Sequence, residues 1–92
     1  MSAAQDAFVD AGALLRLHFP QQYQSAAPHS LWLVQDAAGA VLRSGELAPG
    51  QTFGEIRPAI ERELGAPLRP WRIRSLQNAR GQTVELAVAQ AP

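Results

Sequence analysis

The spacing of apolar and polar residues along the chain predicts two helices and four strands. In residues 3–19, Phe8, Leu15 and Phe19 recur at helical spacing, and the proline at position 20 ends the repeat. Residues 20–30 are polar and predict a linker. Residues 31–35 and 40–45 are short apolar runs separated by a turn sequence with Asp first and Gly last, which predicts a β-hairpin.

A second helix is predicted over residues 53–64. Thr52 and Glu55 have the spacing of a capping box, and Gly65 stands where a left-handed C-cap belongs. Pro58 lies inside the stretch, so we expect either a distorted first turn or a regular helix that begins near Arg57.

Two further strands complete the pattern. Trp71 and Ile73 alternate with Arg72 and Arg74, which predicts a half-buried strand with a charged outer face. A turn at 78–81 leads to a last alternating strand, whose Glu85 is expected to face one of these arginines.

The order α-β-β-α-β-β predicts one α+β domain over residues 1–92. Its expected parts are an N-terminal helix (1–19), a linker (20–30) and a ββαββ core (31–90). We expect a four-stranded antiparallel sheet of two hairpins with two helices packed on one face, because this arrangement buries the apolar faces most simply.

Composition narrows the function classes. Of the 92 residues, 47% are apolar and 17% charged, which is typical of a globular domain. The absence of cysteine excludes disulfides, zinc–thiolate sites and thiol nucleophiles. No run approaches a membrane span or a signal peptide, so an exported or anchored protein would need a targeting segment outside this sequence.

Catalytic motifs are not found, and we expect neither an enzyme nor a cofactor or metal site. His18 and His29 lack metal-ligand spacing and are expected to be structural or solvated. A triad can be drawn from Ser30, His29 and Asp36, but no Gly-x-Ser-x-Gly elbow surrounds any serine. The glutamates at 61 and 63 point in different directions on a helix, and no phosphate-binding loop occurs.

Arginines concentrate late in a chain whose formal net charge is zero. Residues 57–80 hold six arginines and two glutamates, a local excess of +4. An arginine-rich sheet face built from Arg69, Arg72, Arg74 and Arg80 makes a small nucleic-acid-binding module the alternative function. However, Trp71 and its flanking arginines should face opposite sides of the strand, which favours a core tryptophan and a solvated arginine face.

From Phe19 onward the chain resembles the C-terminal domain of TonB-type energy transducers over about three-quarters of its length. The same likeness extends to a TonB-like tail of a membrane-bound sensor peptidase of the β-lactam-regulator kind. The resemblance is carried by Phe19-Pro20, Leu31-Trp32-Leu33-Val34 with Asp36 and Gly39, Val41-Leu42-Arg43, the helix over 53–64, Trp71-Arg72-Ile73-Arg74 and Gly81-Gln82-Thr83-Val84-Glu85.

This resemblance implies a periplasmic, non-enzymatic adaptor that binds an extended peptide or an envelope protein by adding a strand at a sheet edge. Without it, a cytoplasmic location is expected. The last strand, 83–89, carries one charge and would be poorly defended at an edge, where it could also form a homodimer. The candidate partner-binding residues are Arg72, Arg74, Thr83, Glu85, Ala87 and Ala89.

Overall fold

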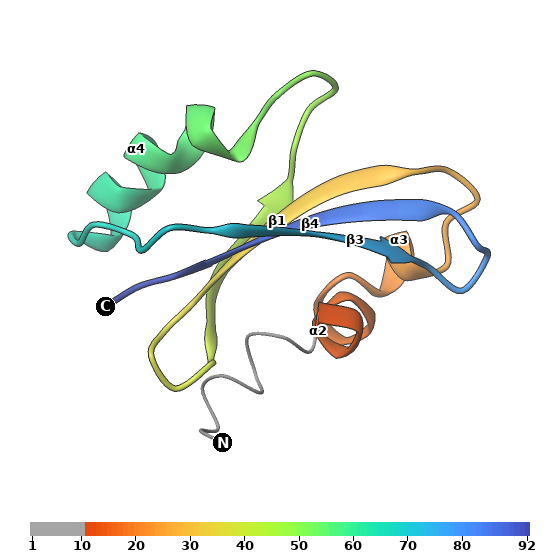
Figure 1. Ribbon diagram of the computed structural model, residues 1–92, viewed down its shortest axis with the longest axis horizontal. Helices are drawn as coiled ribbons and strands as arrows, with labels where there is room; N and C mark the ends of the chain where they lie inside the picture. The colour runs from red at the N-terminus through yellow and green to blue at the C-terminus, as the bar shows by residue number, and fades with distance from the viewer. Residues whose placement is uncertain (1–10) are drawn as a thin grey trace.

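A four-stranded mixed sheet forms the centre of residues 11–92, the part of the chain that this computed structural model describes (Figure 1). The protein is therefore an α+β domain. Its elements are α2 (Ala11–His18), α3 (Pro20–Tyr23), β1 (His29–Gln35), β2 (Val41–Glu46), α4 (Phe53–Leu64), β3 (Arg72–Gln77) and β4 (Thr83–Gln90).

The strand order is β2-β1-β4-β3, and the two central strands run parallel. Both predicted hairpins, β1–β2 and β3–β4, are present and antiparallel, but the prediction of a purely antiparallel sheet is wrong. The reason is that β1 and β4 are apolar on both faces. In β4, Ala87 and Ala89 are as buried as Leu86 and Val88, and strands buried on both faces suit a central, parallel position.

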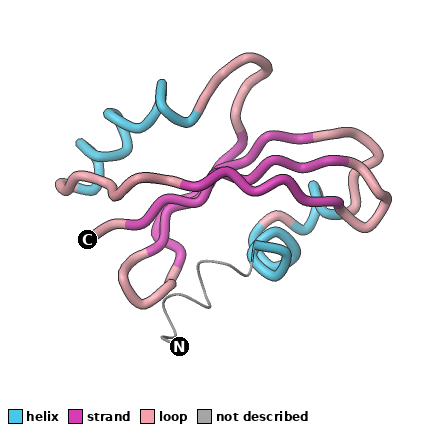
Figure 2. The backbone as a smooth tube through the Cα atoms, viewed as in Figure 1, coloured by secondary structure: helices cyan, strands magenta, loops and turns pink. Residues whose placement is uncertain are grey.

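The helices cover opposite faces of the sheet, so the expectation of two helices on one face is also wrong (Figures 1 and 2). Ala11 and Leu15 of α2 pack with one core cluster on the sheet, which includes Leu31, Leu33, Val84, Leu86 and Val88. Phe53 and Ile60 of α4 pack with a second cluster that includes Val34, Ala87 and Ala89. We call these two surfaces of the sheet the α2 face and the α4 face.

Helix α4 has the predicted bounds and C-cap. Gly65 adopts a left-handed conformation (φ 72°) that a side chain would strain, and its amide donates to the Glu61 carbonyl. The predicted capping box does not form, because Thr52 makes no side-chain cap hydrogen bond. Pro58 lies within the regular helix, so the helix does not begin near Arg57.

The N-terminal region differs from its prediction where it is described. Helix α2 ends at His18, and Pro20 begins the separate helix α3, because proline is well suited to a first helical position. The predicted linker 20–30 thus contains a helix and the start of β1. Phe8 and the rest of residues 1–10 lie outside the described residues.

The turn between β1 and β2 forms as predicted. The Asp36 Oδ1 accepts hydrogen bonds from the amides of Ala38 and Ala40, each at 2.9 Å. Gly39 has a φ of 95°, which explains why glycine occupies the last turn position.

The faces of β3 follow from its register with β4. Arg72 lies opposite Val88 and Arg74 opposite Leu86, so both arginines are on the α2 face. Ile73 lies opposite Ala87 on the α4 face. The expected contact of Glu85 with an arginine is therefore wrong, because Glu85 lies opposite Ser75.

Candidate functional site

Strand β3 forms one edge of the sheet, and its outer side faces no other strand among residues 11–92. Ile73 was expected on the buried face of a half-buried strand, but it is 61% exposed and is not among the residues that pack in the cluster with α4. An edge strand offers backbone donors and acceptors to a partner strand. An exposed isoleucine beside such an edge adds apolar surface for that partner.

The opposite edge, β2, is better defended. Its pairing with β1 is irregular between Val34 and Gln35, and bulges of this kind disfavour further pairing. The Arg43 Nε donates to the Glu63 Oε1 of α4 at 2.6 Å, which ties β2 to the helix. Of the two edges, β3 is therefore the more accessible to a partner strand.

The predicted partner-binding residues divide into two groups. Arg72 and Arg74 lie on the edge strand β3. The remaining four lie on β4, which is central and paired on both sides, so the condition that this strand lies at a sheet edge is not met. Ala87 and Ala89 are buried in the α4 cluster. Thr83 and Glu85 are exposed near the start of β4.

Thr83 and Glu85 line an open pocket of about 320 Å³ on this part of the sheet. The loop that follows β2 forms the other wall, and His29 and Glu46 contribute to the lining as well. Two carboxylates and no arginine line the pocket, which gives it an acidic character.

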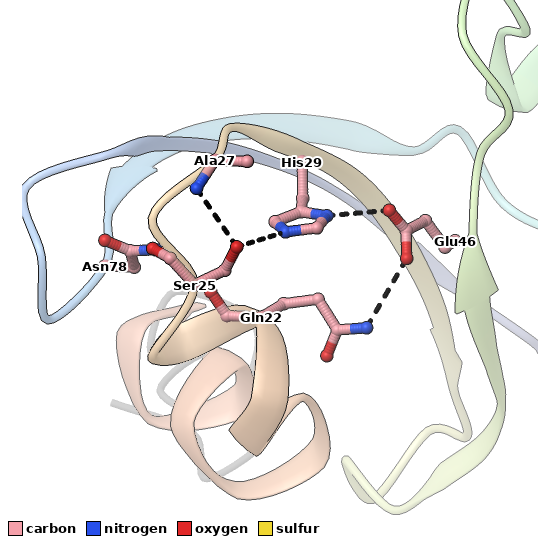
Figure 3. A network of polar contacts seen from close by, with 6 residues as sticks. All are labelled: Gln22, Ser25, Ala27, His29, Glu46 and Asn78. Carbon is pink, nitrogen blue, oxygen red and sulfur yellow. Dashed lines mark hydrogen bonds and ion pairs between the residues drawn. The ribbon is translucent and has the colours of Figure 1, made fainter.

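A hydrogen-bonded row of three side chains lies next to this end of the sheet (Figure 3). The Ser25 Oγ is 2.8 Å from the His29 Nε2, and the His29 Nδ1 is 2.7 Å from the Glu46 Oε2. Ser25 comes from the loop after α3, His29 from the first position of β1 and Glu46 from the last position of β2. We call these three residues the Ser–His–Glu row.

One neutral tautomer of the histidine satisfies both of its contacts. An ionised Glu46 can only accept, so Nδ1–H donates to it, and in the neutral imidazole Nε2 is then left to accept from the serine hydroxyl. The hydrogen bond from His29 lowers the pKa of the Glu46 carboxyl, and Gln22 Nε2, at 3.4 Å from Oε1, acts in the same direction. Glu46 is thus held in the ionised form that this arrangement requires.

The loop that carries Ser25 is fixed by a buried asparagine. The Asn78 Nδ2 donates to the carbonyl oxygens of Gln22 and Ser25 at 3.0 and 2.8 Å. The Asn78 Oδ1 accepts from the amides of Arg80 and Gln82 at 2.9 and 3.0 Å. The Asn78 side chain therefore ties the turn before β4 to the segment before β1, together with the Ala79 amide, which donates to the Tyr23 carbonyl at 2.9 Å.

The triple of Ser30, His29 and Asp36, which the sequence analysis noted and set aside, contains a different serine and a different acid. Asp36 caps the β1–β2 turn instead of contacting the histidine, and Ser30 lies on the opposite face of β1. Glu46 directly follows the predicted second strand of the hairpin, and in the structure it pairs with Leu31, two residues after His29. Ser25 lies in a loop, and no pattern in the sequence indicates that it reaches His29.

Trp71 and the two arginines of β3, Arg72 and Arg74, lie on opposite faces, as the alternation predicts. Its ring packs on the α4 face against Phe53, with ring centroids 5.2 Å apart, and the Arg57 guanidinium lies 5.4 Å from its centroid. Arg72 and Arg74 are on the other face, so the described strands present no surface that combines this aromatic ring with those arginines.

Comparisons with protein-family models, with curated proteins and with solved structures find no match to this chain. Within residues 11–92, no group of three or more His, Asp or Glu side chains gathers as metal ligands would. None of the described helices is long and apolar enough to cross a membrane.

Proposed function

We propose that this domain is a protein-binding adaptor module of the bacterial cell envelope, which recognises an extended peptide by strand addition at β3. The observation that carries the proposal is the 61% exposure of Ile73 on an edge strand. The envelope setting rests on the resemblance to TonB-type C-terminal domains. Main-chain hydrogen bonds supply affinity in this binding mode, and alternate side chains supply specificity.

The charges on β3 favour an acidic partner. Residues directly opposite each other in neighbouring strands share a face, so a partner strand would place alternate side chains beside Arg72 and Arg74. Asp or Glu at those positions would be attracted. Apolar side chains at the intervening positions would lie beside Ile73, on the α4 face.

The same charges disfavour a homodimer through β3. In a homodimer, two β3 strands would pair antiparallel around a twofold axis perpendicular to the sheet. Side chains on the α2 face of one copy would then lie opposite side chains on the α2 face of the other copy. In the registers centred on Ile73 and on Arg74, arginine would then oppose arginine, as Arg72 against Arg74 or as Arg74 against itself. Like charges directly opposite each other destabilise a strand pair, so we assign the edge to a different chain.

The test is an NMR titration of the labelled domain with a peptide that alternates glutamate and valine. We expect amide shifts confined to β3 and its neighbour β4. The Arg74→Glu variant should weaken binding about tenfold, equivalent to roughly 1.4 kcal/mol, because attraction is replaced by repulsion. Arg80→Glu is the matched control, since it changes the net charge equally but lies in the turn before β4.

Two results would refute this proposal. Equal weakening by the two variants would indicate non-specific charge attraction, and shifts confined to the β2 edge would place binding elsewhere. A single-stranded oligonucleotide titrated in parallel tests the nucleic-acid alternative. Shifts on the arginine face that fall steeply with salt would favour that alternative instead.

A further inference from the structure

The Ser–His–Glu row has the connectivity of a nucleophile, a base and an orienting acid. The distance of 2.8 Å between the Ser25 Oγ and the His29 Nε2 is within the range that proton transfer from a serine to a histidine requires. The distance of 2.7 Å between the His29 Nδ1 and the Glu46 Oε2 lets the acid orient the imidazole. We propose that Ser25, His29 and Glu46 form a catalytic triad that transfers the acyl group of a small ester to water. This activity is separate from peptide binding at β3, and neither depends on the other.

With His29 in its neutral form, the row has the proton arrangement that activates a serine. His29 Nε2 accepts the Ser25 hydroxyl proton, while Glu46 holds Nδ1–H and stabilises the imidazolium that forms. Gln22 Nε2 lies 3.4 Å from the other carboxylate oxygen of Glu46 and orients it. The acid is thus positioned from two sides.

The nucleophile is also pre-positioned by its backbone. The buried Asn78 binds the Ser25 carbonyl at 2.8 Å, and the Ser25 amide donates to the Gln22 carbonyl at 3.3 Å. Supporting contacts of this kind hold catalytic groups in a productive geometry. They leave the hydroxyl free to turn between His29 and an incoming carbonyl group.

A backbone donor lies beside the nucleophile. The amide of Ala27 is 3.1 Å from the Ser25 Oγ and donates to it in the resting state. When Oγ bonds to the ester carbonyl carbon, this amide is close enough to turn its hydrogen bond toward the developing oxyanion. A single donor of this kind predicts slow turnover.

The reaction balances with water as the second substrate. Oγ attacks the carbonyl carbon as its proton passes to His29 Nε2, and the collapsing intermediate expels the alkoxide, which takes that proton. An acyl-serine remains. Water then gives a proton to Nε2 and attacks the acyl carbon. The carboxylic acid leaves, and the proton returns to Ser25.

The surroundings limit the substrate class. Ser25 is partly exposed and is not among the residues that line the 320 Å³ pocket, so a small ester can reach it from solvent. The Glu46 side chain is ionised and 45% exposed. Its charge favours neutral or cationic esters over anionic ones.

The first experiment labels the protein with a fluorophosphonate, which reacts with activated serines, and maps the adduct by mass spectrometry. We expect one adduct per chain, on Ser25. Ser25→Ala should remove it, and His29→Gln should slow labelling by about 10²–10⁴-fold. Ser44→Ala, an exposed serine of β2, is the control and should label like the unaltered protein.

The second experiment follows hydrolysis of p-nitrophenyl acetate, with circular dichroism confirming that each variant is folded. Turnover should require both Ser25 and His29 and fall in Glu46→Gln. Absence of a Ser25 adduct on the unaltered, folded protein would overturn the proposal. So would hydrolysis that persists in Ser25→Ala, because it would show that His29 acts alone on this reactive ester.

Discussion

Replacing Asn78 with alanine should destabilise the domain more than its position in a turn suggests. The residue is only 6% exposed, and its side chain makes four hydrogen bonds to backbone groups. Each such bond contributes about 0.5–1.5 kcal/mol net, and a buried partner left without one costs more. Water can reach some of the backbone groups that lose their partner, so we expect the free energy of unfolding to fall by roughly 2–4 kcal/mol.

This loss is large against the 5–15 kcal/mol typical of a whole domain. For a chain of this size it corresponds to a fall in Tm of about 10–30 °C, measured by circular dichroism. Gln77→Ala is the matched control, because Gln77 is the exposed neighbour on β3 and should change stability by less than about 0.5 kcal/mol. If the Asn78→Ala variant melts within a few degrees of this control, the asparagine does not hold the two loops together as argued.

Three further changes test the packing and the electrostatics. A Cβ at Gly45 would lie 2.8 Å from the Trp32 Nε1, so Gly45→Ala should cost roughly 1–3 kcal/mol in urea unfolding. Gly54→Ala meets nothing closer than 3.6 Å and should stabilise α4 by up to about 1 kcal/mol, which thermal melts would detect. The hydrogen bond from His29 lowers the pKa of Glu46. The ionised Glu46 carboxylate therefore stabilises the folded state above pH 4.5, and this stabilisation is lost as the pH falls through the lowered pKa. The stability difference between the unaltered protein and Glu46→Gln should therefore shrink in acid unfolding curves, and a difference independent of pH would contradict this reasoning.

Local features of the fold could be predicted from the sequence. The end of α4 follows from the preference of Gly65 for a left-handed backbone conformation. The turn of the first hairpin follows from the side chain of Asp36 and the backbone of Gly39. Both elements therefore lie where the sequence pattern predicts them. The capping box at Thr52 failed because the motif allows a side-chain hydrogen bond without requiring one.

The sheet order could not be predicted, because alternation gives the faces of a strand but not its neighbours. Alanine is the clearest example. Ala87 and Ala89 were candidate partner-binding residues, whereas in the structure they are small buried side chains in the cluster that packs with α4. Ile73 shows the reverse case, since an apolar residue on a strand was taken as buried and is exposed.

The parallel pairing of β1 with β4 links the two candidate functions. It places β4 in the centre and leaves β3 as an edge. It also aligns the starts of the two strands, with His29 opposite Val84, so the segments that precede them lie side by side. Asn78 can then bind the Ser25 carbonyl across 53 residues of sequence. Had the sheet followed the chain order, β4 would have been an edge, and the Ser25 loop would have lost the contact that positions it beside His29.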